Sequence, residues 1–221
     1  MRICTTVLAV ALLWSLSAQA QAPSEIRTYN IHHALFGDIG KLSDEITLDG
    51  STTRIVTRAE VKVDVLGITL HHVRAEWTET WQDGTLKDYC ATTTRNGGTE
   101  TVSGHHEAGK FVVHTSEREF EAPADVHPVH PWSLQFVHAA TLMSPESGRL
   151  FPAKIEDRGE LSIRIGKTSR NVRHYVASFD TANHFYFDED GKLLAAEYRD
   201  ITGNVRFTLQ SADEARLAAA R

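Results

Sequence analysis

Alternation of apolar and polar residues is the strongest pattern in this chain, and it is clearest over residues 54–81. In the first half of this segment, apolar residues take odd positions (Ile55, Ala59, Val61, Val63 and Val65) and charged residues take even ones. Successive side chains of a strand point to opposite faces, so this period of two predicts a strand with one buried face. After Leu66-Gly67, the second arm of a long β-hairpin is indicated by Val73, Ala75, Trp77 and Trp81.

Similar alternating segments follow one another along the chain, and turn residues separate them. Asp49-Gly50, Asp83-Gly84, Asn96-Gly97 and Asp190-Gly191 are typical of tight hairpins, and residues 37–40 are expected to form another turn. Further strands are expected at residues 27–36, 42–48, 86–94, 99–106, 110–115, 150–156, 161–165, 171–179, 183–187, 192–198 and 205–209. This succession predicts an antiparallel meander rather than alternating strands and helices.

The meander is interrupted by the proline-rich residues 120–131, because proline cannot donate a hydrogen bond to a sheet. Residues 132–143 follow, with Trp132, Phe136 and Ala140 at helical spacing. We therefore expect a mainly β fold, namely a curved antiparallel meander sheet or a partly open barrel with one internal helix at about residues 132–143. A closed barrel, or a sandwich with a helical plug, fits the pattern nearly as well.

The first 20 residues have the features of a signal peptide. Arg2 gives a short positive segment, residues 7–16 are apolar but too few to span a membrane, and Ala18-Gln19-Ala20 is a cleavage signal. Cleavage after Ala20 leaves a single β domain, residues 21–221, with a short helical tail from Ser211. We therefore expect a periplasmic or secreted protein, and we expect no membrane span in the rest of the chain.

Charge and cysteine content narrow the range of functions. The formal net charge of −6 disfavours nucleic acid as a partner, because nucleic-acid binding requires a basic surface. Cys4 belongs to the predicted signal peptide, so Cys90 is left alone and no internal disulfide can form. Free cysteines behave as small core hydrophobes, and we expect Cys90 to be buried.

Histidines are the residues most suggestive of chemistry, and six of the 12 lie in adjacent pairs: His32-His33, His71-His72 and His105-His106. Adjacent side chains of a strand point to opposite faces, so one pair alone cannot chelate an ion. The apolar register shifts at His71-His72, which indicates a β-bulge there.

A metal site would have to combine histidines from different segments. The candidate ligands are His105 and His106 together with His127 and His130, which His138 can approach from the predicted helix. Neutral imidazoles of this kind bind zinc or copper. Histidines that merely lie at the surface and core edge explain the same pattern.

Aromatic residues supply the candidate ligand-binding positions. Trp77, Trp81, Trp132 and Phe136 are expected near a concave surface, where aromatic faces bind lipids, quinones or sugars, although such residues also fill cores. The chain has no GxSxG motif or other catalytic constellation. These features favour a non-enzymatic protein that binds a hydrophobic or lipid-like molecule, with no cofactor, or a structural partner of an envelope protein. The alternative is a histidine-based metal-binding protein or metalloenzyme.

Three stretches resemble a family of exported proteobacterial proteins of unknown function: YNIHHALFGDIGKLSDEI, PWSLQFVHAATLM with SGRLF after it, and HFYFDEDGKLLAAEY. The resemblance implies a Gly-x-Ile-Gly turn, a tryptophan-containing helix in mid-chain and a C-terminal Asp-Gly hairpin, but no particular activity. The expected architecture is also distantly similar to the half-barrel of periplasmic lipoprotein carriers, whose curved sheet and helical lid enclose acyl chains.

Overall fold

The computed structural model describes residues 24–179 and 181–210, so the predicted signal peptide and the tail from Ser211 lie outside the described residues. Strands make up most of the described chain. They are β1 Ser24–His33, β2 Gly37–Asp49, β3 Thr52–Val65, β4 Ile68–Gln82, β5 Thr85–Arg95, β6 Gly98–Glu107, β7 Lys110–Thr115, β8 Glu119–Pro123, β9 His127–Pro128, β10 Thr141–Met143, β11 Leu150–Pro152, β12 Ile155–Ile165, β13 Thr168–Phe179, β14 Thr181–Phe187, β15 Leu193–Arg199 and β16 Asn204–Leu209.

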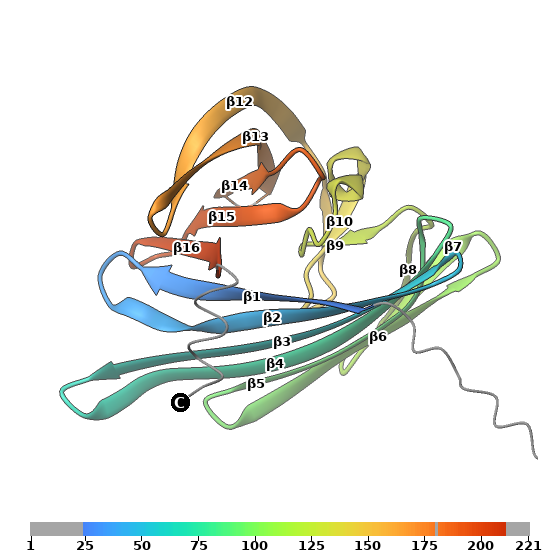
Figure 1. Ribbon diagram of the computed structural model, residues 1–221. Coiled ribbons are helices and arrows are strands. Elements are labelled where there is room, and N and C mark those ends of the chain that lie inside the picture. Colours follow the sequence, from blue (N-terminus) through green and yellow to red (C-terminus); the bar gives the residue numbers. More distant parts are fainter. Residues whose placement is uncertain (1–23, 180, 211–221) are drawn as a thin grey trace, which may run out of the picture.

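Thirteen of these strands form one antiparallel sheet in the order β12-β13-β14-β15-β16-β1-β2-β3-β4-β5-β6-β7-β8. Strands β1 to β8 form the long curved layer in the lower part of Figure 1, and β12 to β16 curl over it. The two meanders join where β16 pairs with β1, with Ile31 opposite Phe207. The edge strands β8 and β12 are not paired with each other, so the sheet is curved but not closed, as the open form of the predicted fold requires.

Two-residue turns connect the long strands and confirm the predicted hairpins. At Leu66-Gly67, Asp83-Gly84, Asn96-Gly97 and Ala108-Gly109, both residues have positive φ. This is the geometry whose twist matches that of the flanking strands, and glycine adopts it without a steric cost.

The turn predicted at residues 37–40 is wrong. The chain turns at residues 34–36, and β2 begins at Gly37. Gly40 lies inside this strand. The position requires glycine because a β-carbon there would stand 2.0 Å from the carbonyl oxygen of Glu60 on β3. Gly40 of the Gly-x-Ile-Gly stretch therefore allows a close approach of β2 and β3, whereas Gly37 has no neighbour this close and adopts a positive φ.

The helix predicted over residues 132–143 is also wrong. The described residues contain no α-helix there, only a 3₁₀ turn at Leu134–His138, followed by β10. Ala139 already has extended backbone geometry, and Leu142 and Met143 are fully buried in the small sheet β11-β10-β9. Burial of these two side chains in a strand therefore outweighs the local helical spacing.

Cys90 is exposed, which corrects the prediction that it is buried. Its neighbours Tyr89 and Ala91 take the inward positions of β5, so strand alternation turns Cys90 to the outer face. The predicted bulge near His71 is confirmed: Val63 pairs with His71 and Asp64 with Thr69, which leaves Leu70 unpaired.

Among the described residues, no helix has the length and hydropathy needed to cross a membrane.

Candidate functional site

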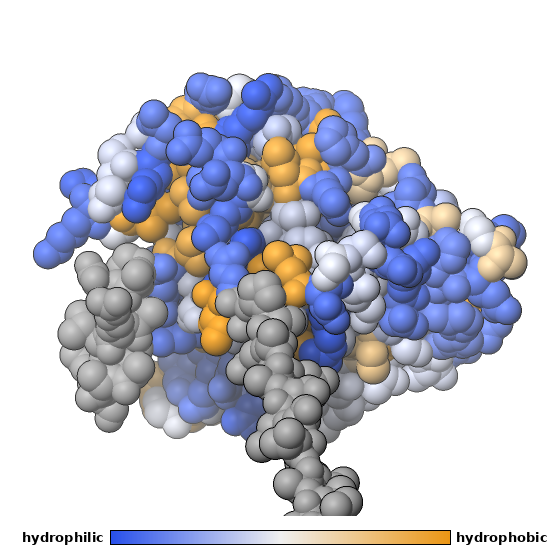
Figure 2. Space-filling view, turned by 45° about the vertical axis from the view of Figure 1, so that its right-hand side comes forward, coloured by the Kyte–Doolittle hydropathy of each residue, from blue (hydrophilic) through white to orange (hydrophobic). Residues whose placement is uncertain are grey.

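An apolar cavity of about 430 Å³ lies in the curl of the sheet. One wall comes from β1, β2 and β4, the opposite wall from β13 to β16, and residues 129–131 and 144–146 together with Phe151 of β11 complete the lining. Its apolar side chains include Leu42, Trp77, Phe151, Phe179, Phe185, Leu193 and Phe207. Figure 2 shows hydrophobic residues gathered in the upper and central part of one face, bordered by hydrophilic residues.

Charged and polar side chains lie on the inner face of the sheet, next to this cavity. Asp44 on β2 is 1% exposed, and Thr57 on β3 and Glu79 on β4 are fully buried. The strand register explains their proximity, since Asp44 pairs with Thr57 and Thr57 pairs with Trp77. Thr57 Oγ1 donates a hydrogen bond to Asp44 Oδ1 over 2.8 Å.

His130 approaches these carboxylates from the proline-rich segment and is itself 8% exposed. Its Nε2 lies 3.4 Å from Asp44 Oδ1, and its Nδ1 lies 4.0 Å from Glu79 Oε1. Its ring packs edge-on against Trp77, with centroids 5.2 Å apart. His130 therefore separates the apolar cavity from two buried acids. We name Asp44, Thr57, Glu79 and His130 the buried acid cluster.

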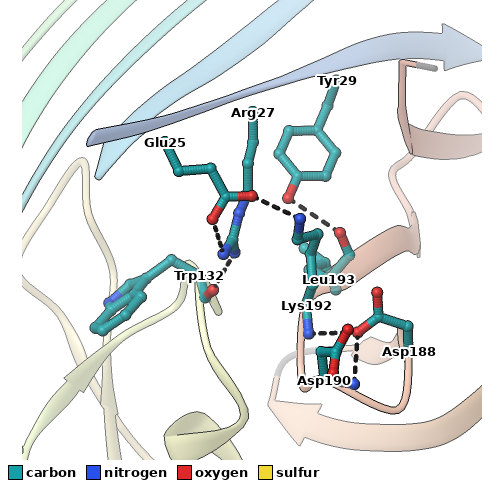
Figure 3. A network of polar contacts seen from close by, with 8 residues as sticks. All are labelled: Glu25, Arg27, Tyr29, Trp132, Asp188, Asp190, Lys192 and Leu193. Carbon is teal, nitrogen blue, oxygen red and sulfur yellow. Dashed lines mark hydrogen bonds and ion pairs between the residues drawn. The ribbon is translucent and has the colours of Figure 1, made fainter. Parts of the chain in front are cut away.

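A network of polar contacts holds the segment that carries His130 (Figure 3). Arg27 donates one hydrogen bond to the carbonyl oxygen of Trp132 over 2.6 Å and another to Glu25 over 2.8 Å. Glu25 also pairs with Lys192, between the Asp188–Asp190 turn and β15, over 2.6 Å. Tyr29 donates to the carbonyl oxygen of Leu193 over 3.1 Å. These contacts join β1, the proline-rich segment and the β14–β15 hairpin around the cavity.

Burial dominates the protonation of Glu79. It raises the pKa of this carboxyl to about 8, although the hydrogen bond from Trp81 Nε1 over 2.8 Å opposes the shift. The negative charge of Asp44 raises the pKa further, and the indoles of Trp132 and Trp77 lower it without making hydrogen bonds of normal geometry. Glu79 is therefore largely protonated and uncharged at neutral pH.

A second cavity of about 460 Å³ lies on the other side of the proline-rich segment. Its lining includes Trp81 and three histidines, His106, His127 and His138. His127 Nδ1 donates to the carbonyl oxygen of Pro128 over 2.8 Å, so its buried Nε2 is the unprotonated nitrogen and has no partner. Burial lowers the pKa of His127 to about 4.

The four predicted aromatic residues lie in one cluster, but only one lines the first cavity. Trp77 borders that cavity, whereas Trp81 borders the second one. Trp132 packs against Trp81, with ring centroids 6.0 Å apart. Phe136 is fully buried between His127 and Phe185 and belongs to the core.

The four predicted metal ligands are spread over three places. His105 stacks on His114 of β7, with centroids 5.6 Å apart; His106 and His127 border the second cavity; and His130 borders the first. The described residues contain no group of three or more histidines, cysteines or acids placed to hold a metal ion. The inner histidines of the adjacent pairs do not meet either, because His33 is held by Thr202 of the distant β15–β16 turn.

Asp44 and Glu79 were not predicted from the sequence, although a signal for them is present. Each occupies an inward position between two apolar residues: Asp44 between Leu42 and Ile46, and Glu79 between Trp77 and Trp81. An acid at an inward position of an otherwise apolar strand face is costly to bury, and so it marks a candidate site.

The model of a family described as a domain of unknown function, DUF6134, matches residues 37–210. The chain belongs to the DUF6134 family. The prediction that the chain belongs to a family of unknown function is thus confirmed.

Two solved structures are similar to this DUF6134 chain. One is a β-barrel-like protein of the domain of unknown function DUF1849 from Brucella abortus, with a TM-score of 0.62 and 12% identity over 86% of this chain and 97% of that one. This likeness concerns the fold alone. The other, a DUF1089 family protein from Pseudomonas aeruginosa, has a TM-score of 0.31 and 12% identity over 91% and 95% of the two chains. No curated protein matches the chain.

Proposed function

We propose that this DUF6134 protein is an exported, non-enzymatic binding protein that holds one hydrophobic or lipid-like molecule in the cavity between the two halves of its curved sheet. The observation that carries the proposal is the cavity itself, with a volume of about 430 Å³ and a mainly apolar and aromatic lining. Cavities of roughly 300–1,000 Å³ with such linings are typical of small-molecule sites. The signal-peptide pattern of the first 20 residues supports a role outside the cytoplasm.

The position of the cavity differs from the one expected between sheet and helix. Residues of β13 to β16 face it from one side, and residues of β1, β2 and β4 from the other. The 3₁₀ turn instead borders the second cavity through Gln135 and His138. A ligand would therefore lie between the N-terminal and C-terminal meanders and contact both.

The proposal is tested by a substitution that fills the cavity with a larger side chain. Ala196 on β15 lines the cavity, and the Ala196→Phe variant places a ring inside it. We expect the fluorescent apolar probe N-phenyl-1-naphthylamine to bind the native protein and to bind the variant at least about tenfold more weakly. Ala182→Phe is the matched control, since Ala182 lies exposed on the neighbouring strand β14. Equal probe binding by both variants, or none by the native protein, would contradict the proposal.

The alternative proposal is a protein that binds zinc or copper through its histidines. It draws support from the second cavity, which His106, His127 and His138 border and where His127 Nε2 is unpartnered, but the described residues place no three such groups close enough to hold an ion together. Ligating imidazole must be unprotonated, and the low pKa of His127 satisfies this condition at neutral pH. Metal analysis of the native protein and of His127→Gln decides this case: equal metal content in both would exclude His127 as a ligand.

A further inference from the structure

Exposed hydrophobic side chains are concentrated at one end of the sheet. Because neighbouring strands run in opposite directions, the β1–β2, β3–β4 and β15–β16 turns all lie at the same end. Figure 1 shows the β1–β2 and β3–β4 turns on its left side. We name residues 34–37, 65–70 and 201–204 the apolar rim. Among the described residues, seven large hydrophobic side chains are at least half exposed, and five of them belong to this rim: Leu35, Leu66, Ile68, Leu70 and Ile201.

The hairpin of β3 and β4 projects past its neighbours at this end. Pairing of β2 with β3 stops at Val61, and pairing of β5 with β4 stops at Val73. Residues 65–70 are therefore not paired with a strand on either side of the hairpin, and the side chain of Leu66 is 98% exposed. Ile201 in the β15–β16 turn is fully exposed as well. Single exposed apolar residues are ordinary, but a group of them marks an interaction surface.

The two ends of the sheet also differ in charge. The three segments of the apolar rim contain no charged residue. Turns at the opposite end carry acids: Asp49 precedes the β2–β3 turn, Asp83 begins the β4–β5 turn, and residues 188–190 of the β14–β15 turn are all acidic. Charged groups are costly to transfer into hydrocarbon, whereas aliphatic side chains gain from it. This difference orients the protein with the rim toward an apolar phase and the acidic turns in water.

The first cavity extends to the same end of the sheet. Tyr198, near the end of β15, lines this cavity, is 37% exposed and lies three residues before Ile201. Glu146 also lines the cavity and pairs with Arg95, the last residue of β5 before the β5–β6 turn. That turn lies at the same end as the β3–β4 turn's neighbours in the rim, because β5 runs parallel to β3. The cavity therefore reaches the end of the sheet that carries the apolar rim.

We infer that the apolar rim docks on the surface of a lipid bilayer, with Leu66, Ile68 and Ile201 inserted among the acyl chains. A protein partner requires one continuous complementary surface, whereas separate hairpin tips can each enter a fluid phase. The docking goes beyond the proposed function and stands on the surface alone. Its consequence rests on the proposed function: an apolar molecule passes between bilayer and cavity at the end where the two meet.

The inference is tested by flotation of the native protein with phosphatidylcholine vesicles, which carry no net charge. We expect the protein to float with the vesicles. Leu66→Ser and Ile201→Ser should each lower the partition coefficient about tenfold, because each removes one fully exposed aliphatic side chain from the contact. The matched control is Leu48→Ser, half exposed beside the β2–β3 turn at the opposite end, which should leave the coefficient within about twofold of the native value.

Two results of this experiment would overturn the inference. One is native protein that stays in the vesicle-free fraction. The other is binding that both rim variants retain, or that Leu48→Ser loses to the same extent, because the contact would then lie elsewhere in the chain. Sedimentation equilibrium without lipid covers a second copy as the occupant: a dimer that both rim variants dissociate, without flotation, would also overturn docking on lipid. Binding of N-phenyl-1-naphthylamine by the cavity is measured separately, so failure of docking is distinguishable from failure of the proposed function.

Insertion among the acyl chains has its own readout. Leu66→Trp places an indole at the tip of the projecting hairpin, and Leu48→Trp places one at the opposite end. With vesicles of phosphatidylcholine brominated on the acyl chains, we expect the fluorescence added by Leu66→Trp to be quenched and that added by Leu48→Trp to be unaffected. Absence of quenching in vesicle-bound Leu66→Trp would overturn the insertion of this tip.

Discussion

Two buried histidines, His33 and His130, both lie beside acidic residues. His33 is fully hydrogen-bonded, whereas His130 is not. His33 lies near Asp200 and Thr202, and His130 lies near Asp44 and Glu79. His33 is 2% exposed, accepts hydrogen bonds at Nδ1 from the backbone nitrogens of Leu35 and Phe36, and contacts Thr202 Oγ1 through Nε2 over 2.9 Å. His130 makes no contact closer than 3.4 Å to its acids, and its Nδ1 has no partner.

The acids beside the two histidines differ in the same way. Burial raises the pKa of Asp200, but hydrogen bonds from Thr202 and Gly203, and the contact with His33, outweigh it and lower the pKa to about 2. Burial raises the pKa of Glu79 to about 8 because one hydrogen bond from Trp81 does not compensate for it. The satisfied cluster ties two turns together, whereas the cluster beside the cavity leaves buried polar atoms without partners.

The largest expected effect is the loss of His33. His33→Ala removes the partner of two backbone nitrogens and of Thr202 and leaves a void, so we expect a loss of about 3 kcal/mol in the free energy of unfolding. Urea denaturation measures it. The matched control is His32→Ala, one residue away but exposed and paired only with Asp38, which should cost no more than about 0.5 kcal/mol. Equal losses in both variants would remove the structural role assigned to His33.

The next effect is a dependence of stability on pH. Glu79 is protonated in the folded protein up to about pH 8 but ionises near pH 4.5 when unfolded, so its contribution is full below pH 4.5 and is lost as pH rises to 8. His127 acts in the opposite sense between its folded pKa of about 4 and its unfolded value of 6.5, so stability is lost as pH falls through that range.

These two contributions oppose each other from pH 4.5 to 6.5, and Glu79 acts alone from 6.5 to 8. There we expect the free energy of unfolding to fall by about 1.4 kcal/mol per pH unit, or about 2 kcal/mol in all. Glu79→Gln should abolish this fall. Glu76→Gln, on the exposed face of the same strand, should preserve it. The same slope in native protein and Glu79→Gln would show that this carboxyl is not the source.

A smaller effect is expected at His130 itself. His130→Ala should cost about 1 kcal/mol or less in unfolding free energy, because no normal hydrogen bond is lost and the new space opens into an existing cavity. Urea denaturation of His130→Ala and His33→Ala, measured side by side, compares the two losses of unfolding free energy directly. A loss as large as that of His33→Ala would mean that both histidines hold the fold together.

The smallest expected effect is at Gly203. A β-carbon there would lie 3.2 Å from His33 Cε1, so Gly203→Ala should push the ring slightly and cost about 0.5–1 kcal/mol. A shift in thermal midpoint of a few degrees checks this. An unchanged midpoint would indicate that the turn around His33 is loosely packed.

Local patterns account for what was predicted from the sequence. The hairpin of β3 and β4 follows from strict alternation and a two-residue turn with glycine. The pairing of β16 with β1 joins residues at opposite ends of the described chain, and no local pattern encodes it. The segment between β9 and β11 was mispredicted because helical spacing at Trp132 and Phe136 competes with the burial of Leu142 and Met143.

Part of the candidate site was predicted from the sequence, and the reason for success or failure differs between residues. Trp77 and His130 were named from residue type, and both line the first cavity. Asp44 and Glu79 were missed because acids are assigned by default to the outer face of a strand. Strand alternation places both acids on the inner face, and the three-dimensional register brings them together beside His130.

Native mass spectrometry of the protein, produced with its own N-terminal segment and purified without a histidine tag, tests the central claim most directly. We predict one adduct of lipid-like mass per chain, released by mild activation and identified after extraction as a mainly apolar molecule. An adduct of one or two transition-metal masses that a chelator removes would contradict this account in favour of the histidine alternative. A bare chain that stays bare after incubation with N-phenyl-1-naphthylamine would contradict the cavity as a binding site.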